Sequence, residues 1–212
     1  MHVIVLPGGG YRVHADHEAE PVRDWLVDAG LEASVFRYPV GTRHPGPLDA
    51  IRSAVRERRD AGASHVGLIG FSAGAHAAGM AALAPGAADS ERVDLAILAY
   101  PVVSMQLPTH AGSRAELLGA DASDALRGET SLDRLVTPQA PPFFIWHTAA
   151  DDLVPVEHSY LLGSALADAG VPHGLHVFPE GGHGLGLARG SGTAERWPEL
   201  CIDWLREGGW LA

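Results

Sequence analysis

The chain has 212 residues, of which 46% are hydrophobic and 19% charged, and its formal net charge is −11. This composition predicts one globular domain with a sizeable core and argues against a disordered chain. The acidic balance argues against nucleic acid as a partner, because a polyanion binds to a basic surface. The single cysteine, Cys201, excludes an intrachain disulfide, and the apolar stretch around it, "WPELCIDWL", favours a buried core thiol.

The N-terminal stretch "MHVIVLPGGG" predicts a strand from its first residues onward. It has neither the charged start nor the long apolar run of a signal peptide, and no segment reaches the length of a transmembrane helix. From these observations we expect a soluble, cytoplasmic protein with no membrane partner.

Short apolar runs rich in Val, Ile, Leu and Phe predict six strands that are covered on both faces. In chain order these runs are Val3–Leu6, Ala33–Tyr38, His65–Gly70, Asp94–Tyr100, Phe143–His147 and Leu175–Phe178. Helical stretches lie between the strands, at about residues 18–29, 47–61, 73–83, 156–169 and 194–207, and several have proline near the start or glycine after the end. The alternation predicts an α/β fold with a mostly parallel six-stranded sheet, helices on both faces, and no separate cap domain.

A run of glycines, Gly8 to Gly10, follows the first predicted strand. It matches neither of the glycine patterns that hold phosphate groups, so we favour an oxyanion loop whose donor is the N–H of Gly9 or Gly10. Tyr11 either borders the substrate pocket or is a core ring. The nearby histidines of "HADHE", residues 14–18, leave a metal site open as a weak alternative.

The sequence Gly70-Phe71-Ser72-Ala73-Gly74 matches G-x-S-x-G between a predicted strand and a helix of small residues. In this setting the motif predicts a nucleophile elbow, where a strained turn exposes the serine. The start of the helix places unpaired N–H groups, with that of Ala73 first, where an oxyanion would develop. The alternative is an ordinary strand–helix turn with a capping serine.

A serine nucleophile needs a base, and position selects that base among 12 histidines. His76 lies one helical turn beyond Ser72 and is predicted to be a packing residue or a pocket wall. His183 follows the last strand between glycines, which let a loop fold back over the carboxyl edge of the sheet. The orienting acid is one of the neighbours Asp151 and Asp152, which residue spacing does not separate.

With these stretches in place, the chain resembles the small α/β-hydrolases of the acetylesterase, acetylxylan-esterase and feruloyl-esterase-like branch. The resemblance covers roughly residues 3–205 through "PGGGY", "IGFSAGAHAA", "AYPVVSM" and the long block "WHTAADDLVPVEHSYLLGSALADAGVPHGLHVFPEGGHGLGL". The pattern H-x-x-x-D-x-x-V-P of this group selects Asp151 over Asp152. The group acts on short acyl esters, typically acetyl groups on sugars. A cytoplasmic member would act on soluble acetylated compounds rather than polymeric xylan.

These observations predict a serine carboxylesterase with the triad Ser72, Asp151 and His183, the oxyanion donors Gly9 or Gly10 with Ala73, and no cofactor or metal. A peptidase or another acyl-transfer enzyme could use the same residues, and a non-catalytic binding module is a third possibility. Residues 105–142 break the strand–helix alternation, with weak helix signals at residues 113–118 and 122–127. We expect this stretch to be an insertion that shapes substrate access, within one domain spanning residues 1–212.

Overall fold

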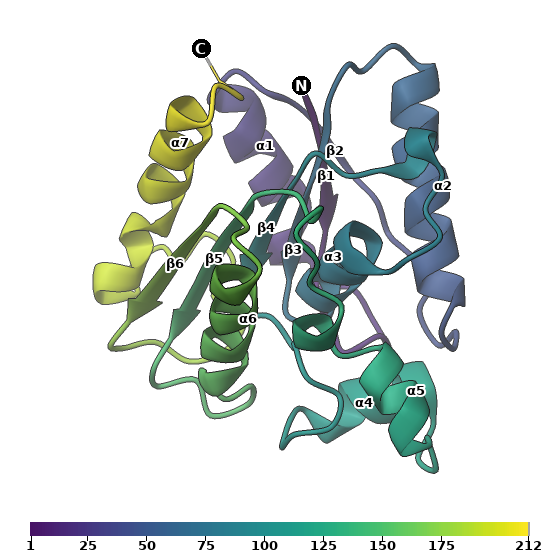
Figure 1. The fold of residues 1–212 in the computed structure, drawn as a ribbon. Coiled ribbons are helices and arrows are strands. Elements are labelled where there is room, and N and C mark those ends of the chain that lie inside the picture. Colours follow the sequence, from purple (N-terminus) through teal and green to yellow (C-terminus); the bar gives the residue numbers. More distant parts are fainter. Residues whose placement is uncertain (212) are drawn as a thin grey trace.

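A six-stranded parallel sheet forms the centre of the computed structural model, which describes residues 1–211 (Figure 1). Its order is β2-β1-β3-β4-β5-β6, and every neighbouring pair is parallel. The strands are β1 (His2–Leu6), β2 (Glu32–Val35), β3 (Val66–Phe71), β4 (Leu95–Ala99), β5 (Phe143–Thr148) and β6 (His173–Phe178). The prediction of an α/β fold with six strands is confirmed.

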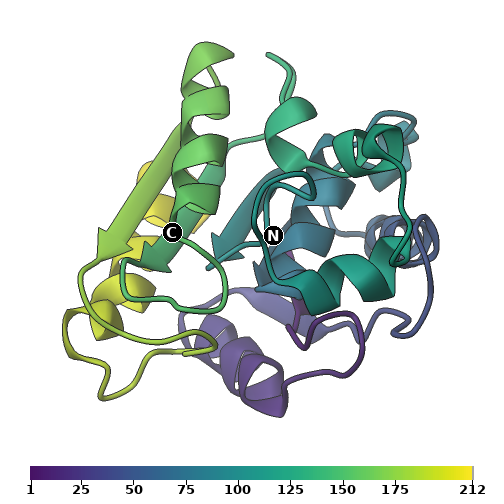
Figure 2. The same ribbon diagram turned by 90° about the horizontal axis from the view of Figure 1, so that it is seen from below.

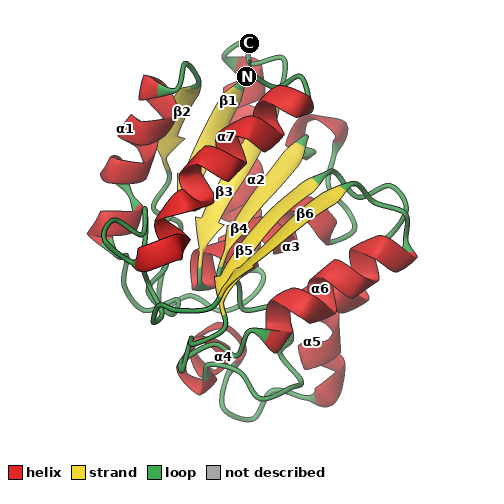
Figure 3. Ribbon diagram, turned by 90° about the vertical axis from the view of Figure 1, so that its left-hand side faces the viewer, coloured by secondary structure: helices red, strands yellow, loops and turns green. Residues whose placement is uncertain are grey.

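The helices that cover the sheet are α1 (Glu20–Asp28), α2 (Gly46–Asp60), α3 (Ala73–Leu83), α6 (Glu157–Asp168) and α7 (Trp197–Glu207). Figure 3 shows α1 and α7 together on one face of the sheet. Two shorter helices, α4 (Ala111–Leu118) and α5 (Asp124–Glu129), lie within the predicted insertion. The 3₁₀-helices are η1 (Asp16–Glu18), η2 (Asp89–Glu91), η3 (Leu132–Arg134) and η4 (Gly192–Arg196).

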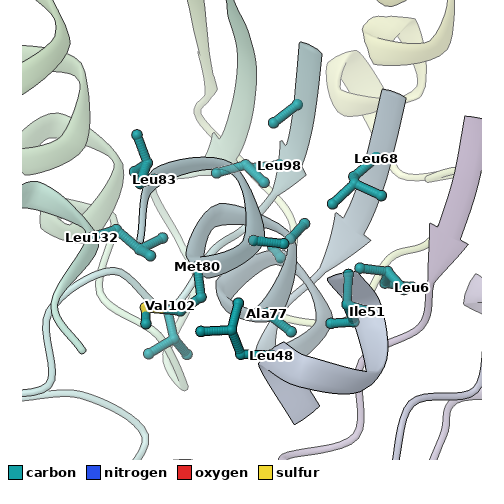
Figure 4. Close-up of a cluster of buried hydrophobic side chains, with 14 of the residues drawn as sticks. Leu6, Leu48, Ile51, Leu68, Ala77, Met80, Leu83, Leu98, Val102 and Leu132 are labelled. Carbon is teal, nitrogen blue, oxygen red and sulfur yellow. The ribbon is translucent and has the colours of Figure 1, made fainter. Parts of the chain in front are cut away.

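Alternate strand residues enter two separate cores, one on each face of the sheet. In β1, Val3 and Val5 pack with α1 and α7, whereas Ile4 and Leu6 pack with α2, α3 and α6. Figure 4 shows part of the second core, in which Ile51 and Met80 lie beside the sheet. Because successive side chains of a strand point to opposite faces, a strand that is apolar throughout must be covered on both sides.

Helix α7 shows how the sequence selects the buried face of a helix. Trp197, Cys201 and Leu205 recur every four residues, lie on one side of the helix, and are fully buried. Burial raises the pKa of the Cys201 thiol, so this residue is the core thiol that its apolar surroundings predict.

Two element boundaries differ from the prediction by three residues, which is more than the other strand boundaries do. Strand β2 was expected to reach Tyr38 but ends at Val35. Phe36 still donates its N–H to the carbonyl of Val5, at 2.9 Å, but β1 ends one residue later and Pro7 has no N–H with which to extend the ladder. The helix expected from residue 194 begins as η4 and becomes α-helical at Trp197, where Pro198 suits the first turn.

The carboxyl ends of the strands share the lower edge of the sheet in Figure 1, and α4 and α5 lie below it. Figure 2 looks onto this edge. Loops that leave β1, β3, β5 and β6 at this edge carry the glycine run, Ser72, Asp151 and His183, respectively. Among residues 1–211, no helix is long and apolar enough to cross a membrane.

Candidate active site

Ser72 is the single residue between β3 and α3, and its backbone is strained, with φ of 53° and ψ of −115°. A non-glycine residue with this φ costs of order 1–3 kcal/mol and persists only where its surroundings fix it. The N–H of Ser72 donates to the carbonyl of Ala99 at 2.9 Å, which ties the turn to β4. The sharp turn predicted from G-x-S-x-G is therefore present.

The two glycines of the motif are required by close packing of the backbone. A Cβ on Gly70 would lie 2.3 Å from the carbonyl oxygen of Gly74, and a Cβ on Gly74 would lie 2.2 Å from the carbonyl oxygen of Leu6. Neither contact is possible for a real side chain, and the clashing atoms belong to the backbone and cannot move away. The glycines thus allow α3 to begin directly against β1 and β3.

Ser72, His183 and Asp151 form a continuous hydrogen-bonded chain. His183 Nε2 lies 2.7 Å from Ser72 Oγ, and His183 Nδ1 lies 2.7 Å from Asp151 Oδ2. Since a carboxylate only accepts, Nδ1 carries the proton, and Nε2 is left to accept from the serine hydroxyl. The imidazole is thereby held in the tautomer that a general base requires.

Asp151 is surrounded by donors on both oxygens. Its Oδ1 accepts from the backbone N–H groups of Leu153 and Val154, each at 2.9 Å, and its Oδ2 accepts from His183 and, at 3.2 Å, from His147 Nε2. Burial by itself raises the pKa of Asp151, but these hydrogen bonds outweigh burial and hold the pKa below its usual value. The neighbouring Asp152 is exposed.

His147 is a member of this site that the sequence analysis placed only at a strand end. It is fully buried, its Nε2 donates to both Asp151 and the carbonyl of Val154, and its Nδ1 lies 2.7 Å from the hydroxyl of Ser159. It therefore helps to fix the same carboxylate oxygen that His183 contacts. The spacing H-x-x-x-D, with three residues between His147 and Asp151, was the signal that could have identified it.

The glycine loop lies against Ser72 and leaves N–H groups available. The N–H of Gly8 donates to Glu18 Oε2 at 2.8 Å, whereas within residues 1–211 no hydrogen bond occupies the N–H of Gly9, Gly10 or Ala73. Gly9 adopts a φ of 126°, and a Cβ there would lie 2.2 Å from the carbonyl oxygen of Val13. A side chain on Gly9 would therefore disrupt the loop.

A cavity of about 270 Å³ opens above Ser72 and His183. Gly9, Gly10 and Leu153 line it. The remaining lining residues are Arg12, Ala15, His17, Glu18 and Gly184 and, from the predicted insertion, His110, Gly112 and Glu116. Among residues 1–211, no group of three His, Cys, Asp or Glu side chains is placed to hold a metal ion.

Tyr11 and His76, which were predicted as possible pocket residues, do not line this cavity. Both are buried, and the Tyr11 hydroxyl lies 2.6 Å from His76 Nδ1. His76 Nε2 donates to the carbonyl of Thr130 at 2.8 Å, so Nδ1 accepts from Tyr11. Tyr11 is therefore a core ring and His76 a packing histidine, which are the two alternatives to a pocket role that the sequence left open.

Comparison with known proteins adds a family and several relatives. The model of the prolyl oligopeptidase family matches residues 48–207. The chain is 38% identical to endo-1,4-beta-xylanase B of Butyrivibrio fibrisolvens, over 88% of this chain and 32% of that protein. It is 31% identical to an acetylxylan esterase of Xylanibacter ruminicola, over 99% of this chain and 45% of that protein. The chain thus spans less than half the length of these curated relatives.

Solved structures resemble the chain over its whole length. An acetyl ester-xyloside bifunctional hydrolase from Caldicellulosiruptor lactoaceticus has a TM-score of 0.94 and 38% identity, over 100% of this chain and 84% of that one. The carboxylesterase Cest-2923 from Lactobacillus plantarum has a TM-score of 0.86 and 28% identity, over 100% of this chain and 86% of that one.

Proposed function

The chain belongs to the prolyl oligopeptidase family and has the α/β-hydrolase fold, and we propose that it is a serine carboxylesterase that hydrolyses short acyl esters. The hydrogen-bonded chain from Ser72 through His183 to Asp151, at the base of a cavity, carries this proposal. The relatives support it, since their names are those of an acetylxylan esterase and a carboxylesterase. Acetyl esters of sugars or other small alcohols are the proposed substrates.

In the proposed mechanism, Ser72 Oγ attacks the carbonyl carbon of the ester while its proton passes to His183 Nε2. Asp151 stabilises the imidazolium that forms, and its low pKa keeps it ionised throughout. Collapse of the tetrahedral intermediate breaks the bond to the alcohol oxygen, which takes the proton from His183 and leaves an acyl-enzyme on Ser72. Water then attacks the acyl group by the same proton transfers, releasing the acid and restoring the serine.

The oxyanion of each tetrahedral intermediate would be held by the N–H of Ala73 and that of Gly9 or Gly10. These groups have no hydrogen-bond partner within residues 1–211, so they are free to donate to a substrate. Fixed donors of this kind stabilise the transition state without the reorganisation that water requires. Gly8 is not a candidate, because Glu18 already accepts its N–H.

The substrate proposal rests on the size and lining of the cavity. A volume of about 270 Å³ suits a small ester, and Arg12, His110 and Glu116 are among the residues that line the cavity. Two of these residues belong to the segment 105–142, which we propose shapes substrate access within a single domain. We retain the prediction of a cytoplasmic location, under which soluble acetylated oligosaccharides are better substrates than polymeric xylan.

A peptidase is the second candidate, because the family that matches the chain is named for an oligopeptidase. The same triad cleaves amides and esters, so the fold does not distinguish the two. Rates on acetyl, butyryl and octanoyl esters, compared with aminoacyl amides, separate them. An esterase hydrolyses the acetyl ester fastest and leaves the amides intact.

The variant Ser72→Ala tests the nucleophile. We expect it to abolish hydrolysis of p-nitrophenyl acetate and labelling by a fluorophosphonate, with an unchanged circular dichroism spectrum. Ser164→Ala, on the exposed side of α6, is the matched control and should retain full activity. Full residual turnover in Ser72→Ala would show that the mechanism is wrong. A panel of acetylated sugars with released acetate measured then identifies the alcohol.

A further inference from the structure

Glu18 is a buried carboxylate that the proposed mechanism does not use. It ends η1, and only 2% of its surface is exposed. Its Oε2 accepts from the N–H of Gly8 at 2.8 Å, and its Oε1 accepts from the hydroxyl of Tyr100 at 2.6 Å. Both partners are donors, which is the arrangement that suits an ionised carboxylate.

The charge of Glu18 lies in an unfavourable place for stability. The basic group nearest to it is His17, whose Nε2 lies 3.7 Å from Glu18 Oε1 and donates instead to the carbonyl of Gly184 at 2.8 Å. Burying a carboxylate without a close cation costs free energy that a neutral side chain would not. A residue that opposes stability beside the candidate nucleophile points to a role in function.

The two hydrogen bonds of Glu18 reach the two loops on which the chemistry depends. Gly8 begins the glycine loop, and a Cβ on it would lie 3.2 Å from the Cβ of Ser72. On the other side, the Tyr100 hydroxyl accepts from the N–H of Gly186 at 2.9 Å, in the loop that carries His183. The ring of Tyr100 also packs edge-on against the imidazole of His183, with 5.0 Å between ring centres.

We propose that Glu18 is a positioning residue that holds the oxyanion donors and the general base in register through Tyr100. The proposal rests on the function proposed above. The two loops leave β1 and β6, and three other strands lie between these two in the sheet. No pairing of strands therefore fixes one loop relative to the other. A carboxylate that bonds to one loop directly and to the other through a phenol supplies that connection.

The consequence is kinetic, because donors and base must act on one carbonyl group at the same time. Loss of the connection should lower kcat and leave substrate binding nearly unchanged. A displacement of about 1 Å can cost on the order of 100-fold in rate, so we expect Glu18→Gln to lower kcat by about 10- to 100-fold. Because the variant removes a buried charge that opposes stability, its melting temperature should not fall.

The test compares Glu18→Gln, Tyr100→Phe, the double variant and Asp16→Asn on p-nitrophenyl acetate. If the two residues act through one connection, the double variant should be no slower than Glu18→Gln, since the second change removes nothing further. Rates of fluorophosphonate labelling of Ser72 should fall in parallel with kcat. Asp16→Asn is the matched control, because it removes an exposed charge from the same short helix and should leave kcat unchanged.

Wild-type kcat in Glu18→Gln, or losses that multiply in the double variant, would overturn the inference. A rise in KM with unchanged kcat would do the same, since it would place Glu18 in substrate binding instead. Tyr100→Phe decides the question if Glu18→Gln does not fold, and wild-type kcat in Tyr100→Phe would then count against the connection. Failure of the proposed function would be recognised differently, because the wild-type chain would then neither hydrolyse esters nor react with the fluorophosphonate. In that case the inference about Glu18 would be wrong as well.

Discussion

Replacing Asp151 by asparagine tests the site more sharply than any other single change, because it keeps the shape and removes only the charge. In the structure each carboxylate oxygen accepts from two donors: Oδ1 from the N–H groups of Leu153 and Val154, and Oδ2 from His183 and His147. An asparagine has one acceptor oxygen and one NH₂ group. Half of the four donors therefore lose their acceptor.

The orientation of the new amide follows from which donors can adapt. The backbone N–H groups cannot change their protonation, so the amide oxygen should face them and the NH₂ should face the imidazoles. His183 must then accept at Nδ1 and carry its proton on Nε2, towards Ser72 Oγ. In that tautomer it cannot take the serine proton, and we expect kcat to fall by about 10⁴-fold, or about 5 kcal/mol of transition-state stabilisation.

Steady-state hydrolysis of p-nitrophenyl acetate, with the uncatalysed rate subtracted, measures this loss. Asp152→Asn is the matched control, because it makes the same chemical change one residue away on an exposed side chain. It should alter kcat by less than about twofold, since exposed charges interact weakly. Equal losses in the two variants would refute the assignment of Asp151, and a loss of only a few-fold in Asp151→Asn would refute the tautomer argument.

Two further predictions concern the scaffold beneath the site. Gly74→Ala should prevent folding to an active enzyme, because its Cβ would lie 2.2 Å from the carbonyl oxygen of Leu6. Gly182→Ala, which has open space at its Cβ, is the control and should retain activity. Soluble yield and esterase rate are measured for both variants. Burial lowers the pKa of His76 to about 4 from its ordinary 6.5, so this histidine favours folding above pH 6.5 and that contribution is lost as the pH falls towards 4. Urea denaturation should show wild type losing about 2 kcal/mol from this source between pH 7 and pH 5, and His76→Gln should lack that part of the loss.

The fold could be predicted from the sequence because its strands are apolar on both faces. Runs such as residues 143–147 can only be central parallel strands, and the glycines and prolines at the helix ends separate them clearly. The end of β2 could not be predicted in the same way. It depends on where the neighbouring β1 stops, at Leu6 before Pro7, and this is a property of the pair of strands.

Some residues of the candidate site could be predicted from the sequence and others could not, and the difference has a physical reason. Ser72 and His183 each follow a strand and have glycines within two residues on both sides, and this local pattern is visible in the sequence. Tyr11 and His76 were proposed for the pocket from their proximity in sequence to the loop and the elbow, but their side chains turn into the core and bond to each other. The direction of a side chain depends on its neighbours in space, and Glu18 was missed for the same reason.

The residues that work against stability are the ones that define the site. Ser72 adopts a φ of 53°, and Asp151 and Glu18 are charges held where only 8% and 2% of each residue is exposed. Each is compensated by hydrogen bonds that also fix its position. The N–H of Ser72 bonds to β4, the carboxylate of Glu18 accepts from two donors, and that of Asp151 accepts from four. A hydrophobic replacement at these positions would suit the core better, and under the proposed function the three residues are accounted for by chemistry on a bound ester.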